Sequence, residues 1–126
     1  ANIIERQNKG CLAVIGSVAG DRGRQSNYIY GATKAGLATL VHGIQHRLAP
    51  GKAHALLVKP GFVDTAMTAH IPNRGGPLWA TPQTVATIID RATRKRRAIV
   101  YAPGFWRMIM AIVRAVPRPV FHRTKL

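Results

Sequence analysis

Two short apolar runs separated by one long helical stretch constrain the fold of this chain more than any other feature. Cys11–Ile15 (CLAVI) and His54–Val58 (HALLV) are almost wholly apolar and have the length of strands, as is typical of strands buried on both faces of a parallel sheet. Between them, residues 27–48 carry apolar side chains at helical spacing and stop before Pro50. A strand, a helix and a second strand form a βαβ unit. We therefore predict an α/β fold with a parallel sheet.

The rest of the chain continues this alternation. Thr81-Pro82 is typical of a helix start with proline in the first turn. Ala98–Ala102 (AIVYA) is a third strand-like run. The sequence thus predicts about three strands with flanking helices over residues 1–103. Residues 105–116 (FWRMIMAIVRAV) form an amphipathic helix with aligned arginines, and prolines end it, so residues 104–126 are predicted to be a separate basic tail.

The chain is strongly basic, and this bears on its partners. Nineteen Lys and Arg residues oppose four Asp and Glu residues, for a formal net charge of +15. Such an excess of positive charge favours binding to polyanions. One possible function is therefore that of a non-catalytic basic module that binds an anionic membrane or nucleic acid. The one basic cluster, at 94–97, closes a predicted helix, where cations also suit the helix dipole.

Cysteine and histidine give no metal site. Cys11 is the only cysteine, which excludes a disulfide framework and fits a cytoplasmic setting. His42 and His46 lie four apart on the predicted helix but have no third ligand at a suitable spacing. We predict no metal, and no apolar run is long enough to span a bilayer.

Three polar residues at defined spacings are the candidates for a catalytic group. Ser17 follows the first apolar run, Tyr30 comes thirteen positions later, and Lys34 four after that. Residues i and i+4 of a helix share one face, so the Lys34 ammonium should lie close to the Tyr30 phenol. A nearby positive charge favours the ionised form of a phenol and makes tyrosine a usable acid or base near neutral pH. Pro60-Gly61 ends the second run.

This order of strand, Ser, Tyr/Lys helix, strand and Pro-Gly resembles the short-chain dehydrogenases/reductases. The resemblance implies the C-terminal half of a Rossmann-type, doubly wound parallel sheet. The glycine-rich phosphate-binding motif of that fold does not occur here, so we expect the chain alone to be inactive. For the whole enzyme, the resemblance implies hydride transfer between NAD or NADP and a carbonyl or alcohol substrate.

The resemblance also implies roles for individual residues. Tyr30 would exchange a proton with the substrate oxygen, Ser17 would hydrogen-bond that oxygen, and Lys34 would favour the Tyr30 phenolate and hold the nicotinamide ribose. The implied catalytic residues are therefore Ser17, Tyr30 and Lys34. The implied cofactor-binding residues are Tyr30, Lys34, Pro60, Gly61, Val63 and Thr65. The resemblance also implies that the segment 67–79 is the place of the family's mobile substrate lid.

Partners follow from the helix and the tail. Gly36 and Gly43 on the long helix indicate close approach of another helix. The resemblance implies that this helix belongs to a second copy, in a homodimer or homotetramer. The alternative is that glycine is simply tolerated at these two positions. The tail 104–126 carries Trp, Phe and Arg and has no acidic residue. This composition suits a helix that lies in the plane of an anionic membrane, and we expect it at the inner face of the cell membrane. The alternative is a tail that docks on its own subunit or on a dimer mate.

The tail carries one finer resemblance. Tyr101-Ala-Pro-Gly-Phe-Trp and the closing Lys125-Leu126 resemble a bacterial subgroup that is similar to the reductase of a decaprenyl-phosphate-linked 2-keto-pentose. This implies a lipid-linked carbonyl substrate in place of an ordinary small molecule. The resemblance to an enzyme family implies no nucleic-acid partner.

Overall fold

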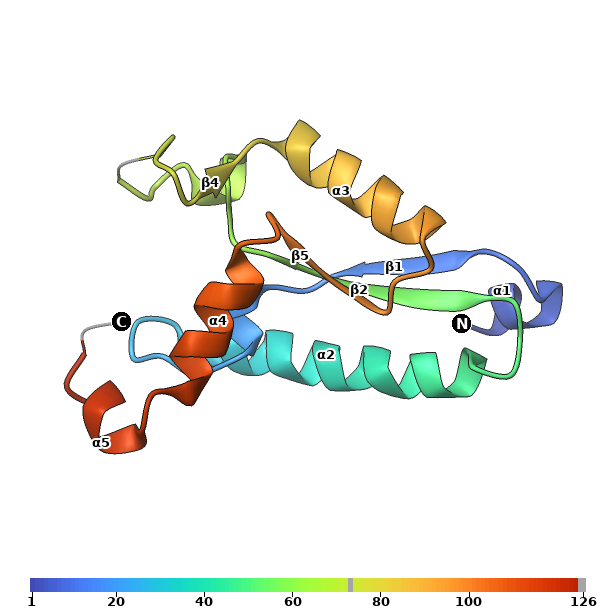
Figure 1. The fold of residues 1–126 in the computed structure, drawn as a ribbon, viewed down its shortest axis with the longest axis horizontal. Coiled ribbons are helices and arrows are strands. Elements are labelled where there is room, and N and C mark those ends of the chain that lie inside the picture. The colour runs from blue at the N-terminus through green and yellow to red at the C-terminus, as the bar shows by residue number, and fades with distance from the viewer. Residues whose placement is uncertain (73, 125–126) are drawn as a thin grey trace.

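The computed structural model describes residues 1–72 and 74–124 (Figure 1). Its elements, in chain order, are α1 (Asn2–Gln7), β1 (Cys11–Ile15), the 3₁₀ turn η1 (Val18–Gly20), α2 (Tyr28–Leu48), β2 (His54–Pro60), β3 (Phe62–Val63), the 3₁₀ turn η2 (Ala66–Thr68), β4 (Trp79–Ala80), α3 (Pro82–Arg94), β5 (Ile99–Ala102), α4 (Trp106–Ala115) and α5 (Arg118–Phe121). The predicted helices and the three predicted strands are confirmed. Lys125 and Leu126, which carry part of the subgroup resemblance, lie outside the described residues.

The main sheet is parallel and has the order β1-β2-β5. β1 pairs with β2 so that Cys11 lies opposite His54 and Ile15 opposite Val58. The central strand β2 is the least exposed part of the molecule, because its neighbours cover both edges and helices cover both faces. This arrangement confirms the α/β class and explains why the run His54–Val58 is almost wholly apolar.

Helices cover the two faces of the sheet, with α2 on one side and α3 on the other (Figure 1). Alternate residues of β2 point to opposite faces. Leu57 packs with Val41 and Leu48 of α2, whereas Leu56 and Val58 pack on the α3 side, in a cluster that also contains two residues of that helix and one of β5, namely Val85, Ala92 and Ala102.

The starts of α3 and α2 differ in their capping. The Thr81 hydroxyl accepts a hydrogen bond from the Thr84 amide at 3.1 Å, with Pro82 in the first turn of α3, as predicted. Asn27 occupies the N-cap position of α2, but its side chain makes no capping bond and its Oδ1 is buried without a partner among the described residues.

A short parallel pairing of β3 with β4 was not predicted. It brings Trp79 against Phe62, with ring centroids 5.2 Å apart. The predicted lid segment 67–79 is therefore held at its base by two-residue strands. Asn73, within this segment, lies outside the described residues.

The helix α4 crosses the end of the sheet where β2 and β5 finish (Figure 1). Trp106 and Met110 point inward and are 7% and 6% exposed, packed with Val18 of η1. The opposite side of α4 carries exposed Met108 and Ile112. The division between residues 1–103 and 104–126 stays a prediction. No helix among the described residues is long and apolar enough to cross a membrane.

Candidate active site

The carboxyl ends of the three parallel strands meet at one edge of the sheet, which is where ligands bind in open α/β sheets. β1 is followed directly by Gly16 and Ser17, and the Gly16 amide donates to the Val58 carbonyl at 2.7 Å. β2 ends at Pro60, and the Gly61 amide donates to the Ala102 carbonyl of β5 at 3.1 Å. Ser17 and the Pro60-Gly61 turn, far apart in the sequence, thus lie at the same edge.

Ser17 begins the 3₁₀ turn η1. Its hydroxyl oxygen accepts a hydrogen bond from the Ala19 amide at 3.1 Å. This bond orients the side chain but leaves the hydroxyl hydrogen free, because the oxygen acts there as an acceptor only. Ser17 can therefore donate a hydrogen bond to a ligand oxygen at the sheet edge.

The turn η1 packs directly on the backbone at the start of α2. A Cβ at Gly20 would lie 2.8 Å from the Lys34 carbonyl carbon, and a Cβ at Gly31 would lie 2.9 Å from the Ala19 carbonyl oxygen. Real Cβ atoms essentially never approach so closely, so these glycines permit a backbone-to-backbone contact. The contact sets how the Ser17 turn sits against the helix that carries Tyr30 and Lys34.

Tyr30 and Lys34 lie together, as their spacing predicted. The Lys34 Nζ is 5.7 Å from the centroid of the Tyr30 ring. It also donates to the Ile15 carbonyl at the end of β1, at 3.1 Å. The lysine therefore ties α2 to the strand that leads into Ser17. The Tyr30 side chain remains open to solvent, with 41% of the residue exposed.

The other predicted cofactor-binding residues follow β2. Val63 is half-buried, and its carbonyl accepts a hydrogen bond from the Thr68 hydroxyl at 2.6 Å. Thr65 is exposed at the start of η2, and its amide donates to the same Thr68 hydroxyl at 3.1 Å. Gly61 lies under the Trp106 indole: a Cβ there would be 2.0 Å from two of its ring atoms.

Sequence reasoning missed a buried charged cluster beside the Ser17 turn. The Lys59 Nζ lies 2.5 Å from Asp21 Oδ1, and the Tyr101 hydroxyl donates to Asp21 Oδ2 at 2.7 Å. Burial, with the neighbouring Asp21 carboxylate next in importance, raises the pKa of Tyr101 to about 12, so its hydroxyl stays a hydrogen-bond donor at neutral pH. The signal was a lysine directly before Pro60 at the end of a buried strand, with one of only four acids in the loop after Ser17.

The neighbouring Arg22 ties the same loop to the C-terminal helices. Its Nη1 donates to the Val113 carbonyl and, at 2.7 Å, to the Val116 carbonyl. Its guanidinium carbon lies 3.8 Å from the centroid of the Phe121 ring, in cation–π geometry.

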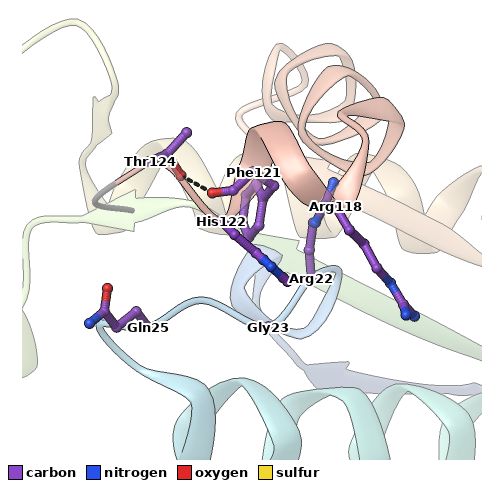
Figure 2. A pocket seen from close by; sticks show the side chains of 7 residues that line it. All are labelled: Arg22, Gly23, Gln25, Arg118, Phe121, His122 and Thr124. Carbon is purple, nitrogen blue, oxygen red and sulfur yellow. Dashed lines mark hydrogen bonds between the residues drawn. The ribbon is translucent and has the colours of Figure 1, made fainter.

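A cavity of about 390 Å³ opens beside this contact. Figure 2 shows the loop residues on one side and the end of the chain on the other. Its lining is basic and polar and consists of Arg22, Gly23, Gln25, Arg118, Phe121, His122 and Thr124. Elsewhere, within residues 1–72 and 74–124, no three His, Cys, Asp or Glu side chains come together as metal ligands would.

The geometry defines a Rossmann-like parallel sheet, with Ser17 after β1 at its carboxyl edge and the Lys34 ammonium hydrogen-bonded to the last residue of β1. The family model of the short chain dehydrogenases matches residues 1–75. An uncharacterized oxidoreductase of Streptomyces coelicolor is 35% identical over 120 residues, which cover 95% of this chain and 47% of that protein. An uncharacterized oxidoreductase of Mycobacterium tuberculosis is 36% identical over 115 residues, covering 91% of this chain and 45% of the relative. The chain belongs to the short chain dehydrogenase family.

Solved structures show the same fold. A short chain dehydrogenase from Burkholderia cenocepacia, in complex with NADP, superposes with a TM-score of 0.79 at 22% identity, covering 96% of this chain and 50% of that one. One from Sphingobium yanoikuyae, in complex with NADPH, gives a TM-score of 0.71 at 20% identity, covering 94% and 50%. The chain therefore spans about half the length of the proteins that it matches.

Proposed function

We propose that the whole protein is a nicotinamide-dependent oxidoreductase that transfers a hydride between NAD(P) and a carbonyl or alcohol substrate. The observation that carries the proposal is Lys34, whose ammonium lies beside the Tyr30 ring while it is hydrogen-bonded at the end of the strand that leads into Ser17. Membership of the family supports it. No separate observation favours the alternative of a non-catalytic basic module.

The residues present fit such a cofactor and substrate. The Lys34 ammonium has three N–H donors and uses one on the Ile15 carbonyl, so it can hold the hydroxyls of a nicotinamide ribose. Pro60, Gly61, Val63 and Thr65 would flank the nicotinamide, with Thr65 exposed. Among the structural relatives, some are complexes with NADP or NADPH and another, from Burkholderia phymatum, with NAD; we therefore propose NAD or NADP.

When bound, the cofactor supplies the hydride that forms the new C–H bond at the carbonyl carbon. The electron pair of the C=O π bond moves to the oxygen, which takes the proton of the Tyr30 hydroxyl. The Ser17 hydroxyl donates a hydrogen bond to the same oxygen and stabilises its developing negative charge. The Lys34 ammonium, 5.7 Å from the centroid of the Tyr30 ring, is the positive charge that lies beside the phenolate left on Tyr30. In the reverse direction the phenolate takes the proton of an alcohol.

The test is Tyr30→Phe in the whole protein. Loss of the proton donor should lower kcat by at least about 100-fold, while titration calorimetry shows that the cofactor still binds. Tyr28→Phe is the matched control, because Tyr28 lies on the same helix and is 65% exposed. A Tyr30→Phe enzyme with near wild-type kcat, or an equal loss in both variants, would exclude Tyr30 from the reaction.

We further propose that the carbonyl substrate is lipid-linked and is met at the inner face of an anionic membrane. The supporting observation is the outer side of α4, where Met108 and Ile112 are 68% and 61% exposed next to exposed Arg107 and Arg114. Such a surface combines apolar and cationic attraction to a membrane. Trp106 is already buried in the fold and adds nothing to it.

Vesicle co-sedimentation of the whole protein tests this surface. Met108→Gln with Ile112→Gln should reduce binding to vesicles containing phosphatidylglycerol, and salt should weaken binding of the wild type. Ile3→Gln is the control, since Ile3 is 64% exposed on α1. Equal binding by all variants, or no binding at low salt, would contradict a membrane role for α4.

We also propose that the whole enzyme is a homodimer or homotetramer that uses α2. A Cβ at Gly36 or at Gly43 would meet nothing within 4 Å, and Leu40 between them is 60% exposed. This surface can accept the close approach of a helix from a second copy. Leu40→Lys should shift the oligomer toward monomer in light scattering, and an unchanged mass would contradict the proposed interface.

A further inference from the structure

Three polar side chains that the proposed reaction does not use meet inside the fold, next to the Ser17 turn. The side chains of Asp21 and Lys59 are only 2% and 10% exposed. Lys59 binds one oxygen of the Asp21 carboxylate and Tyr101 the other. Both oxygens of the carboxylate thus have a donor, and the buried positive charge has its counter-charge.

The three residues come from three separate segments. Lys59 and Tyr101 are direct neighbours across β2 and β5 in the parallel register, each one residue before its strand ends. Asp21 follows η1, and its amide donates to the Val18 carbonyl at 3.0 Å. Because Ser17 begins this same turn, the carboxylate ties the far end of the Ser17 turn to the ends of both strands.

Stability alone gives little reason for this cluster. Replacing a buried ion pair by apolar residues of similar volume is often neutral or stabilising, because desolvation of the charges offsets their attraction. What an ion pair adds over an apolar contact is direction and a short, defined separation. Here that separation is between the Ser17 turn and the strand that leads into Pro60-Gly61.

We propose that Asp21, Lys59 and Tyr101 are positioning residues for the reaction, which hold the Ser17 turn in register with the end of β2. This inference rests on the proposed function. Without the ion pair, the turn keeps its contact with α2 but gains freedom over β2. The Ser17 hydroxyl then binds the substrate oxygen less often in the reactive geometry, so kcat falls while cofactor affinity stays the same.

Arg22 supplies the second half of this arrangement. Asp21 anchors the loop inward to the sheet, and Arg22 anchors it outward, through the carbonyls of Val113 and Val116, to the end of α4. The loop after Ser17 is thus bound on both sides by side chains of two consecutive residues. The C-terminal helices thereby support the turn that carries the catalytic serine.

The experiment separates positioning from stability by comparing single and double variants of the whole protein. Asp21→Asn or Lys59→Met alone leaves a buried charge unpaired and should lower Tm. The double variant removes both charges, keeps an acceptor for Tyr101, and should recover Tm. We expect its kcat to stay roughly 10- to 100-fold below wild type, with unchanged KM for the cofactor. Asp90→Asn, which breaks an exposed ion pair on α3, should change neither.

A readout that does not depend on activity completes the test. Hydrogen exchange followed by mass spectrometry over residues 16–25 should be faster in the double variant than in wild type, and unchanged in Asp90→Asn. If the double variant regains both Tm and a kcat within about twofold of wild type, or if exchange over 16–25 is unaltered, the positioning role is overturned. If the wild-type protein reduces no carbonyl with NAD(P)H, the proposed function is refuted instead. The hydrogen-exchange result then still tests whether Asp21, Lys59 and Tyr101 hold the Ser17 turn to the end of β2.

Discussion

Gly61→Ala tests how α4 is seated on the turn after β2. A methyl at Gly61 would lie 2.0 Å from Trp106 Cε2 and Nε1, so the indole must move. It has little room, because Trp106 is 7% exposed and its ring packs edge-on against Phe62, with centroids 5.6 Å apart. Gly61 is not among the glycines with positive φ, so alanine itself fits the backbone and the cost comes from the overlap.

The magnitude follows from overpacking of a closed contact. Forcing an extra methyl into such a site costs about 1–3 kcal/mol, against a gain of about 0.4–1 kcal/mol that Gly→Ala gives by restricting the unfolded chain. We expect a net loss of roughly 1–2 kcal/mol in the free energy of unfolding, measured in urea with an unchanged m-value. Gly104→Ala, whose methyl meets nothing within 4 Å, should lose no stability.

A double-mutant cycle identifies the clashing partner. In a Trp106→Leu background the alanine methyl has space, so Gly61→Ala should cost much less than in the wild type; residues in direct contact show such non-additivity. Two results would refute this packing: Gly61→Ala is as stable as Gly104→Ala, or it lowers the free energy of unfolding equally in both backgrounds. In either case Trp106 does not lie on the turn after β2, and α4 does not pack there as described.

Three further perturbations have defined outcomes. Gly20→Ala places a methyl 2.8 Å from the backbone of α2 and should lower kcat at least about tenfold, whereas Gly23→Ala, with nothing within 4 Å, should leave kcat unchanged; equal activities would contradict the contact. Since the pKa of Tyr101 is raised from 10.0 to about 12, the folded state keeps a proton that the unfolded chain loses, and stability should fall as pH rises through that window. Tyr101→Phe should remove this slope and the late step in the tyrosinate absorbance titration; a late step that persists would refute the assignment. Thr81→Ala removes the cap of α3 and should cost about 1 kcal/mol in urea unfolding, and an unchanged midpoint would mean that the cap bond contributes nothing.

The sheet and the proximity of Lys34 to Tyr30 could be predicted because their signals are local. Each strand of a doubly covered parallel sheet is one apolar run, so Cys11–Ile15 and His54–Val58 are visible without knowledge of their partners. A residue that directly follows such a strand must lie at the carboxyl edge. Ser17 and Pro60-Gly61 each come at the end of such a run, and Tyr30 and Lys34 lie one helical turn apart, so these places could be read from the sequence.

The buried cluster and the seating of α4 depend on contacts between distant segments. Asp21 is 38 positions from Lys59 and 80 from Tyr101. No pattern in the neighbouring sequence indicates that these three side chains contact one another. The helix α4 is apolar on more than one side, so its pattern alone does not show that Trp106 turns inward while Met108 stays exposed. The pairing of β3 with β4 involves two residues on each strand, too few to leave a periodic signal.

The close contact of η1 with α2 also says how much freedom the intervening loop has. Gly20 and Gly31 place the two backbones against each other, and Asp21 and Arg22 are tethered beyond them. The residues from Gly23 to Ser26 therefore only bridge two ends whose positions are already set. Lengthening a flexible loop is inexpensive, about 0.6 kcal/mol for each doubling. The fold therefore does not require the interval of thirteen residues between Ser17 and Tyr30. Extra residues inserted after Gly23 should leave the Ser17 and Tyr30 hydroxyls in the same positions.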